Sequence, residues 1–427
     1  MNSLSTWPQI YSLDQIEAAT SILDGQVVGH FRGLIICSHF QPIFSIAHKR
    51  PVGYEALLRA KNHAGASVSP LDVFDMAQSE AENIFLDRLC RNLHVRNFIT
   101  MSDETSWLFL NINPLVTIRG KNYGAFFAEL LERYRIPAYR IVIEILEKRI
   151  QDESLLADAV AYYKELGCLI AIDDFGAGHS NFDRIWRLSP QVVKLDRSMI
   201  AQAASNFKVR RVLPNLISLI HESSSLSLIE GVETEEEALI AMDSGIDFVQ
   251  GYYFGRPEKT IQSSNQALSI MPRLCEKFRQ FTFQESRKYR SKLQSYISAF
   301  LSFAKQIETG HQAEIACLDF LSNTKISRCY LISENGSQLG STMISPLHNS
   351  LCDPRFRPLQ EAKDANWSRR HYFQRAINNH GEVQVSRPYL SITDANMCVT
   401  LSVSVNCGSE TQVLCCDLDW ANDVDQL

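Results

Sequence analysis

Acids, amides and one amine follow the short apolar runs in the first 260 residues of the chain. They are Glu55, Asn111, Glu144, Asp173 with Asp174, Lys194, Glu230 and Gln250. Carboxylates gathered in one place repel one another unless cations are bound among them. Sites built from oxygen ligands select hard ions such as Mg²⁺ or Mn²⁺. If these side chains meet, they predict a metal site.

The adjacent aspartates Asp173 and Asp174 point to a particular chemistry. One carboxylate of such a pair can bridge two metal ions about 4 Å apart, the arrangement used for in-line cleavage of phosphodiesters. Each residue alone has a plainer interpretation. A glutamate at a strand end is usually a solvated cap, an Asp-Asp-Phe-Gly run can be a turn, and a lone lysine such as Lys194 is usually surface charge. Seven polar positions at successive strand ends favour the chemical interpretation.

A barrel of parallel strands would bring these residues to one rim. Short runs rich in Val and Ile alternate with segments of helical spacing, such as residues 155–166 and 209–220. The runs lie at 34–37 (continuing at 43–46), 52–57, 107–112, 141–146, 168–172, 192–195, 226–229 and 248–249. This alternation predicts an α/β fold, a (β/α)8 TIM-like barrel. An open doubly wound sheet is the alternative that periodicity leaves open.

The pattern changes after Pro257. Apolar residues between Tyr289 and Ile307 recur at spacings of three and four, which predicts a long helix over about 262–309 that packs along a partner or a neighbouring domain. Short strands and turns follow, with Asn335-Gly336 as a turn, and indicate a small α+β domain. We expect a barrel at 1–260, a helical connector at 261–311 and a small domain at 312–427.

The composition excludes several classes of protein. Of 427 residues, 45% are hydrophobic and 21% charged, and the formal charge is −6, which gives no support for binding long nucleic acid or an anionic membrane. The sequence contains no apolar run of about 18 residues and no signal-peptide pattern. Eleven cysteines without a CxxC pair suit buried, reduced thiols. We expect a cytoplasmic protein.

Taken in order, the motifs resemble the EAL-domain family of bacterial cyclic di-GMP phosphodiesterases. They are QPI at 41–43, EALLR at 55–59, LNINP at 110–114, EILE at 144–147, DDFGAG at 173–178, VKLD at 193–196, EGVET at 230–234 and QGYYFGRP at 250–257. The resemblance covers roughly residues 15–258. It implies a homodimer that uses two ions of Mg²⁺ or Mn²⁺ to hydrolyse cyclic di-GMP to linear 5′-pGpG.

The resemblance also implies a role for each motif residue. Metal ligands would be Glu55, Asn111, Glu144, Asp173 and Asp174, with Asp173 bridging. Catalytic residues would be Lys194 at the nucleophilic water or phosphate, Glu230, which would reach the second metal through a water, Gln250 near the same water, and Glu55. Substrate contacts would come from Gln41, Leu58, Arg59 and Asp196, with Arg59 suited to a phosphate. Glu147 would steady the loop that begins at Asp173.

Two residues of that loop depart from the family pattern. Ala177 and His179 stand where the commonest family form has Thr and Tyr. Alanine is a mild change, whereas His179 can alter loop packing or dimer contacts. All expected metal ligands are present, which favours an active enzyme over the alternative of a cyclic di-GMP receptor that signals through a partner. An unrelated barrel hydrolase would need every motif to coincide by chance, and no GGDEF-like cyclase motif occurs.

The C-terminal segment resembles PAS-like and Cache-type sensor domains. The resemblance rests on Trp367, Tyr372-Phe373, Ala376, residues 387–390 and the Val-rich strand that follows. The aromatic cluster either lines a pocket for an unknown small molecule or forms the core of a small sheet. We expect this domain to regulate the barrel.

Overall fold

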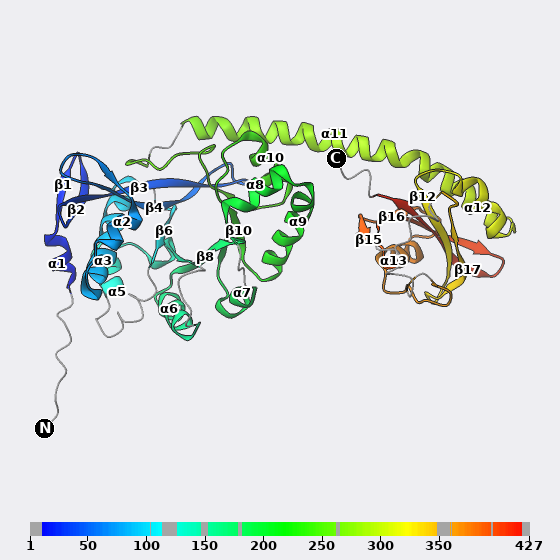
Figure 1. The fold of residues 1–427 in the computed structure, drawn as a ribbon, viewed down its shortest axis with the longest axis horizontal. Coiled ribbons are helices and arrows are strands. Elements are labelled where there is room, and N and C mark those ends of the chain that lie inside the picture. The colour runs from blue at the N-terminus through cyan, green and yellow to red at the C-terminus, as the bar shows by residue number, and fades with distance from the viewer. Residues whose placement is uncertain are drawn as a thin grey trace, which may run out of the picture. The chain divides into compact units, whose positions relative to one another are not determined.

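The computed structural model describes residues 11–102, 104–112, 126–146, 153–177, 182–261, 265–347, 359, 361–393 and 396–420. The chain divides into two compact units, Met1–Arg279 and Gln280–Leu427. The division falls inside one long helix, α11 (Asn265–Glu308), which is drawn in yellow-green in Figure 1. Within the described ranges, no helix combines the length and the apolar character needed to cross a membrane.

Eight strands of the first unit close into a ring, so the predicted TIM-like barrel is confirmed and the open sheet is excluded. Seven of them are parallel: β4 (Arg50–Lys61), β6 (Trp107–Asn111), β7 (Ile141–Leu146), β8 (Leu169–Phe175), β9 (Val192–Leu195), β10 (Leu226–Ile229) and β11 (Phe248–Val249). The eighth, β3 (Leu34–Ser45), pairs antiparallel with both β4 and β11 and closes the ring.

The antiparallel strand corrects the expected regular alternation of strand and helix. Only residues 46–49 separate β3 from β4, and a parallel connection needs a crossover of about a dozen residues or more. The two strands therefore form a hairpin, and the helical crossovers begin only after β4.

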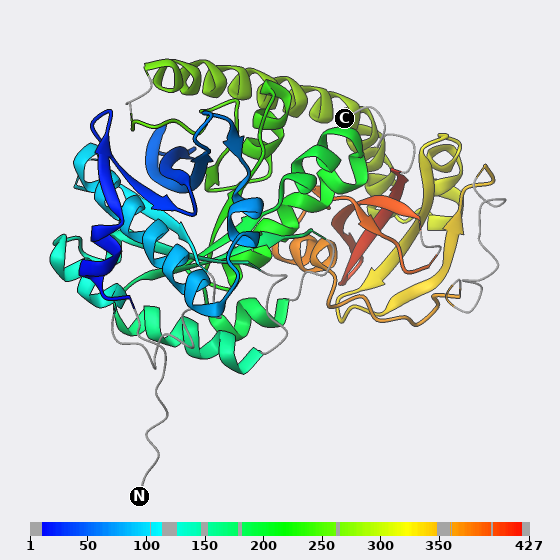
Figure 2. The ribbon, with the colours of Figure 1, turned by 60° about the vertical axis from the view of Figure 1, so that its left-hand side comes forward.

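Further short elements extend or cover the barrel (Figures 1 and 2). Strands β1 (Thr20–Leu23), β2 (Gln26–Phe31) and β5 (Ser67–Val68) continue the sheet at its two ends. The helices are α1 (Leu13–Ala18), α2 (Pro70–Asp75), α3 (Glu80–Met101), α5 (Phe126–Arg133), α6 (Glu153–Glu165), α7 (Phe182–Leu188), α8 (Arg197–Ser205), α9 (Phe207–Glu222) and α10 (Glu235–Asp243), with a 3-10 turn, η2 (Ala138–Arg140). Met271 and Leu274, at the start of α11, are buried in the same core as these helices and the outer faces of the strands.

The second unit is built on an antiparallel sheet. Its strands are β12 (Ile326–Ser333), β13 (Gln338–Ile344), β14 (Gln384–Val385), β15 (Tyr389–Leu390), β16 (Met397–Cys407) and β17 (Glu410–Asp419). Residues of α11 from Leu293 to Ile307 and helix α12 (Ala313–Leu321) share a core with this sheet. Helix α13 (His371–Asn378) packs in a separate core with Tyr330 and Cys415.

The helical pattern predicted for residues 262–309 thus corresponds to α11, and its apolar residues from Leu293 to Ile307 pack in the core of the second unit. Its role as a connector and the boundaries at 260 and 311 stay predictions, as does the likeness of the second unit to PAS and Cache domains. All cysteines in the described ranges are free thiols and most are buried. Cys415 and Cys416 lie in different cores, on opposite faces of the sheet.

Candidate active site

The barrel interior holds an apolar layer to which seven of the eight strands each contribute one buried side chain. These residues are Ile43, Phe109, Val142, Ala171, Val192, Leu228 and Phe248. Side chains alternate between the two faces of a strand, so the residue two positions away returns to the interior. Two positions beyond this layer, the parallel strands carry Asn111, Glu144, Asp173, Lys194, Glu230 and Gln250. This polar layer lies at the carboxyl ends of the strands, where barrel enzymes carry their active sites.

Strands β4 and β3 complete the polar layer with Glu55 and Gln41. Gly53 takes the place of an apolar side chain on β4, because a Cβ there would lie 2.9 Å from Phe109 Cε2. Glu55 is two residues farther along the same strand. Since β3 runs in the opposite direction, its polar residue comes two positions before Ile43. That residue is Gln41, the register partner of Glu55.

Two amide side chains hold the carboxylate of Glu55. Asn111 Nδ2 donates to Oε1 at 2.8 Å, and Gln250 Nε2 donates to Oε2 at 2.7 Å. The same nitrogen of Gln250 lies 3.3 Å from Gln41 Oε1, and Gln41 Nε2 donates to the Gly255 carbonyl at 3.2 Å. Because Glu55 is only 8% exposed, these contacts fix a carboxylate that has little access to water.

Lys194 lies among the carboxylates of the polar layer. Its Nζ is 2.5 Å from both Glu144 Oε1 and Glu230 Oε1. It is 3.2 Å from Asp173 Oδ1 and 3.8 Å from Glu55 Oε2. When these four carboxylates are ionised, one ammonium leaves three negative charges in excess. Since Lys194 is 1% exposed and Glu144 is 0% exposed, water screens this excess poorly.

The pKa values of the site reflect the excess negative charge. Burial raises the pKa of Glu144 well above its usual value, and the charge of Glu55 raises it further. Burial also raises the pKa of Glu230 to about 8, against the opposing effect of Lys194. Burial alone would raise the pKa of Glu55, but Lys194 and the two amides outweigh it and lower that pKa. Burial opposes the charge of Lys194, yet the carboxylates raise its pKa well above the usual value.

The donor atoms of this rim fit hard divalent cations. Glu144 Oε2 and Gln250 Oε1 are buried and meet no hydrogen-bond donor within the described ranges. The acceptors around Lys194 are all carboxylate oxygens, which suit Mg²⁺ and Mn²⁺. In the described part of the chain, however, no three His, Cys, Asp or Glu side chains surround a common ion position. The residues therefore fit metal ions by their chemistry, and holding them requires these side chains to rearrange around Lys194.

Asp174 departs from regular strand geometry. Its φ of 59° lies in the left-handed region, which few residues other than glycine adopt. The register of β8 with β9 shifts between Ile172 and Phe175, and the Asp174 amide donates to Asp173 Oδ1 at 3.0 Å. Bulges of this kind often re-aim side chains next to active sites. The bulge interrupts the regular alternation of side chains between the two faces of β8. The Asp174 side chain therefore need not point away from the face that carries Asp173.

Of the predicted substrate contacts, only Gln41 lies in the polar layer. Arg59 is half-buried on β4 and its Nη1 donates to the Leu58 carbonyl at 2.8 Å. The Leu58 side chain packs in the core outside the barrel strands, away from Glu55. Asp196 follows β9 and caps helix α8, where its Oδ1 accepts from the Ser198 amide at 3.0 Å.

Two glycines position the site, and the sequence interpretation missed both. Gly53 makes room for Phe109 below Glu55, and a Cβ at Gly251 would lie 2.1 Å from the Val232 carbonyl oxygen. A glycine in or directly after a strand often marks such a close approach, so the signal was present in the sequence.

The predicted roles of Glu147 and His179 concern residues that lie outside the described ranges. The structure therefore leaves the effect of this loop on the site as a prediction.

The fold and rim define a TIM-like barrel with an acidic, lysine-centred site at its carboxyl end. The family model described as "EAL domain" matches residues 32–257, more than half of the chain. The protein therefore belongs to the EAL-domain family.

Similar proteins extend this comparison. The chain is 27% identical over 382 residues to the uncharacterized EAL-domain containing protein YkuI of Bacillus subtilis, covering 84% of this chain and 86% of YkuI. It is 26% identical over 230 residues to the cyclic di-GMP phosphodiesterase PdeF of Escherichia coli, covering 53% of this chain but 30% of PdeF. This second match falls short of two thirds of the relative and carries no information on its other parts.

A solved structure shares the fold of both units. The crystal structure of Bacillus subtilis YkuI, in complex with substrate c-di-GMP and calcium, matches with a TM-score of 0.76 and 22% sequence identity. The match covers 90% of this chain and 96% of that chain. Since the first unit ends at Arg279, a match of this extent reaches into the second unit.

Proposed function

We propose that this protein is a cyclic di-GMP phosphodiesterase that releases linear 5′-pGpG. The proposal rests on one observation: four carboxylates converge on the buried amine of Lys194 at the rim of an EAL-family barrel. The names of two relatives support it, since PdeF is a cyclic di-GMP phosphodiesterase and the YkuI structure contains c-di-GMP as substrate.

The metal ligands in this proposal are Glu55, Asn111, Glu144, Asp173 and Asp174, holding two ions of Mg²⁺ or Mn²⁺. Bound ions of this kind lower the pKa of a water and neutralise charge on the phosphate. The protein itself keeps the ligands in place: Asn111 and Gln250 each donate to one oxygen of Glu55 and so orient its carboxylate. The irregular pairing of β8 with β9 at Asp174 is compatible with a second carboxylate from β8 at the rim.

Lys194, Glu230 and Gln250 complete the proposed catalytic set. The charged amine of Lys194 orients the attacking water or stabilises the negative charge that develops on the phosphate. Glu230 lies 2.5 Å from that amine and limits its movement. Gln250 Oε1, which meets no donor among the described residues, can accept a hydrogen bond from the water. The P–O3′ bond of one phosphodiester breaks, water supplies the oxygen of the new 5′-phosphate, and the leaving 3′ oxygen takes up a proton to become a hydroxyl.

Substrate binding is proposed for Gln41, Arg59, Leu58 and Asp196. Arg59 suits a phosphate oxygen because a guanidinium donates in a planar fork. Since the Leu58 side chain faces away from the rim, its contribution would come from the backbone. Glu147 is proposed to steady the loop after Asp173.

One experiment decides between hydrolysis and the alternative function, a receptor that binds cyclic di-GMP without turnover. Purified full-length protein is incubated with cyclic di-GMP and Mg²⁺ or Mn²⁺, and the products are separated by chromatography and identified by mass spectrometry. Formation of 5′-pGpG supports the enzyme. Binding without product supports the receptor, and a Glu144→Gln variant serves as the control for contaminating activity. Absence of both binding and product contradicts both functions.

We also propose that the protein is a homodimer whose second unit adjusts the activity of the barrel through α11. Trp186, on the helix that follows the loop after Asp174, is 61% exposed and is the residue proposed to lie in the dimer interface. The second unit contributes no residue to the polar layer described above, so regulation is the role that fits it.

A further inference from the structure

The second unit contains a cleft beside the first turn of α13. Its volume is about 470 Å³, within the range of roughly 300–1,000 Å³ that is typical of small-molecule sites. Arg370, Arg375, Arg387 and His371 line it, together with the rings of Tyr372 and Tyr389. No acidic residue in the described ranges is among the lining residues. The cleft is therefore basic and partly aromatic.

The three arginines have donors to spare. Arg375 Nη1 donates to the Val385 carbonyl at 3.2 Å. The Arg370 guanidinium lies 5.7 Å from the ring centre of Tyr389 and 5.9 Å from that of Trp367. Within the described residues, none of Arg370, Arg375 and Arg387 forms an ion pair with a carboxylate. Three positive side chains around one hollow repel each other, so an anion between them would be stabilised.

The backbone adds to this positive potential. Arg370 is the N-cap residue of α13, and no side chain caps the amides of the first turn. The amino-terminal end of a helix carries a partial positive charge and unpaired N–H groups, both of which favour anions. The cleft opens at this end of the helix, since Arg370, His371 and Tyr372 are consecutive lining residues.

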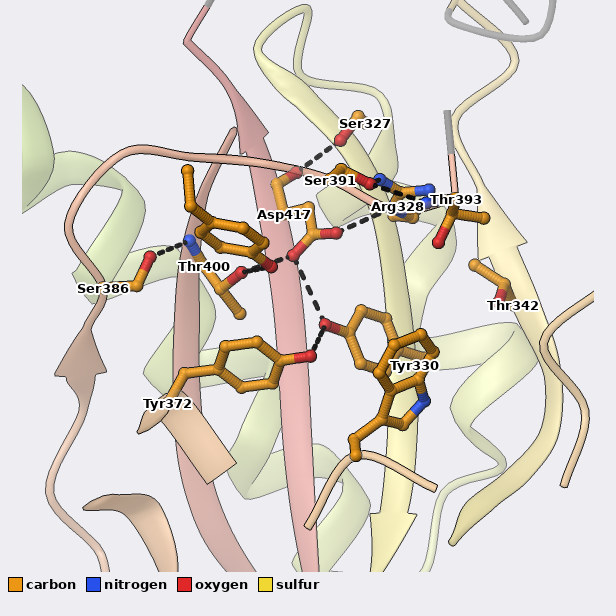
Figure 3. A network of polar contacts seen from close by, with 12 residues as sticks. Ser327, Arg328, Tyr330, Thr342, Tyr372, Ser386, Ser391, Thr393, Thr400 and Asp417 are labelled. Atoms are coloured by element: carbon orange, nitrogen blue, oxygen red, sulfur yellow. Dashed lines mark hydrogen bonds and ion pairs between the residues drawn. The ribbon is translucent and has the colours of Figure 1, made fainter. Parts of the chain in front are cut away.

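A buried network holds the aromatic wall of the cleft in position (Figure 3). Asp417 accepts hydrogen bonds from Thr400 Oγ1 at 2.7 Å and from Arg328 Nε at 2.7 Å. Tyr330 OH lies 3.4 Å from Asp417 Oδ1 and 3.1 Å from Tyr372 OH, and its single proton is donated to one of the two oxygens at a time. The wall is therefore anchored to strands β12, β16 and β17 from behind.

The second tyrosine of the wall joins the same network. Tyr389 OH lies 2.7 Å from Thr400 Oγ1, and its ring stacks with that of Tyr372 at 6.1 Å. A hollow of about 20 Å³, large enough for one water, lies behind the wall and shares Arg370 and both tyrosines with the cleft. A wall fixed in this way loses little freedom when a ligand binds, which favours affinity.

We propose that this cleft binds a small anion that carries at least two negative charges, on carboxylates or on phosphate. More than one negative charge is needed to match three guanidinium groups, and the stacked tyrosines contact the body of the ligand. The site lies wholly in the second unit, so the inference is independent of hydrolysis by the barrel.

The test measures binding to full-length protein by isothermal titration calorimetry, with thermal unfolding as a second readout. The carboxylate probes are succinate and citrate, the phosphate probes are inorganic phosphate and GMP, and guanosine is the neutral control. We expect at least one anionic probe to bind at millimolar concentration or below, while guanosine does not. Whether the carboxylate or the phosphate probes bind shows which of the two acidic groups the ligand carries.

Two variants locate the site. The double variant Arg370→Gln with Arg387→Gln should weaken binding by about tenfold or more, because it removes two charged hydrogen-bond donors from the cleft. Arg369→Gln is the matched control, since Arg369 is exposed, adjacent in sequence and outside the cleft. The proposal is overturned if no anionic probe binds, if the double variant binds as the wild type does, or if Arg369→Gln weakens binding equally. Unchanged binding in the double variant would place the anion elsewhere, including the catalytic rim.

Discussion

Lys194 Nζ and Glu144 Oε1 approach to 2.5 Å although their strands, β9 and β7, are not neighbours in the barrel. Strand β8 lies between them and contributes Asp173 to the same amine. One lysine thus joins side chains from several strands across the barrel interior. The charge of this lysine and the metal ions proposed here would compete for the same carboxylates.

Hydrolysis of cyclic di-GMP should require Mg²⁺ or Mn²⁺, and Ca²⁺ should inhibit it. The oxygen ligands of the rim accept Ca²⁺, but its larger size and irregular coordination hold a water poorly for in-line attack. The measurement is product formation by protein stripped of metal and then given each ion. Hydrolysis by protein shown by elemental analysis to be metal-free would contradict the assignment.

Replacing Lys194 by alanine should lower kcat on the order of 10²-fold while nucleotide affinity changes little. A contact made mainly in the transition state lowers kcat and leaves ground-state binding nearly intact. Lys208→Ala, at an exposed position on α9, is the matched control. Steady-state kinetics and calorimetric binding give the two quantities, and thermal unfolding verifies that the variant is folded. A variant with kcat within a factor of two of wild type would show that Lys194 has no catalytic role.

Gly53→Ala should destabilise the barrel by about 1–3 kcal/mol, the usual effect of overpacking a core. The added Cβ would lie 2.9 Å from Phe109 Cε2 and 3.1 Å from Trp107 Cβ. Urea unfolding measures the change in free energy. The double variant with Phe109→Leu is the control: if the contact with the ring is the cause, the second substitution should partly offset the first. If the free-energy changes of the two substitutions simply add, the strain does not come from the contact with the Phe109 ring.

Phe300→Ala should destabilise the second unit by about 3–5 kcal/mol, because the Phe300 ring is fully buried in the core that α11 shares with the sheet. The neighbouring Leu301 is 43% exposed, so Leu301→Ala should cost far less. Differential scanning calorimetry of the full chain compares the two variants. Equal losses would mean that α11 does not pack on this sheet through the stripe described above.

A chain cut after Arg279 should keep a folded barrel and lose the influence of the second unit. Met271 and Leu274 belong to the barrel core, so the cut must follow them and not the predicted boundary at 260. We expect a change in kcat or KM of up to about tenfold, which corresponds to a bias of about 1.4 kcal/mol between two states of the barrel. Light scattering gives the oligomeric state of the same sample.

The result of this truncation separates regulation from assembly. A dimer with unchanged kcat and KM would show that the second unit neither regulates nor assembles the barrel. A monomer with unchanged specific activity would leave it only a structural role.

The polar layer was predictable because side chains alternate regularly along each strand and neighbouring parallel strands align these positions. On the parallel strands, each apolar residue of the layer in the barrel interior is followed two positions later by a polar one. The direction of β3 was not predicted, although only residues 46–49 separate it from β4, a length that fits a hairpin. The bulge at Asp174 has no signal in the sequence, because it depends on the pairing of β8 with β9.

Of the basic cleft in the second unit, the sequence predicted only the aromatic residues. The aromatic residues Tyr372 and Tyr389 drew attention to a pocket or a core, and they serve both: their rings line the cleft while their hydroxyls join the buried network. The arginines that give the cleft its charge carry no periodic pattern, so only the folded chain gathers them around one hollow.

The antiparallel strand that closes the barrel has a consequence for the order of folding. Gln41 and Glu55 face each other across a local hairpin, which can form within microseconds. Gln250 reaches Glu55 over a separation of 195 residues, and closing so long a loop carries a large entropic cost. The hydrogen bond between Gln250 and Glu55 should therefore be among the last contacts to form. A collapsed barrel that has not closed would lack this contact and therefore a complete nucleotide site. Nucleotide binding would then distinguish the closed barrel from such an intermediate.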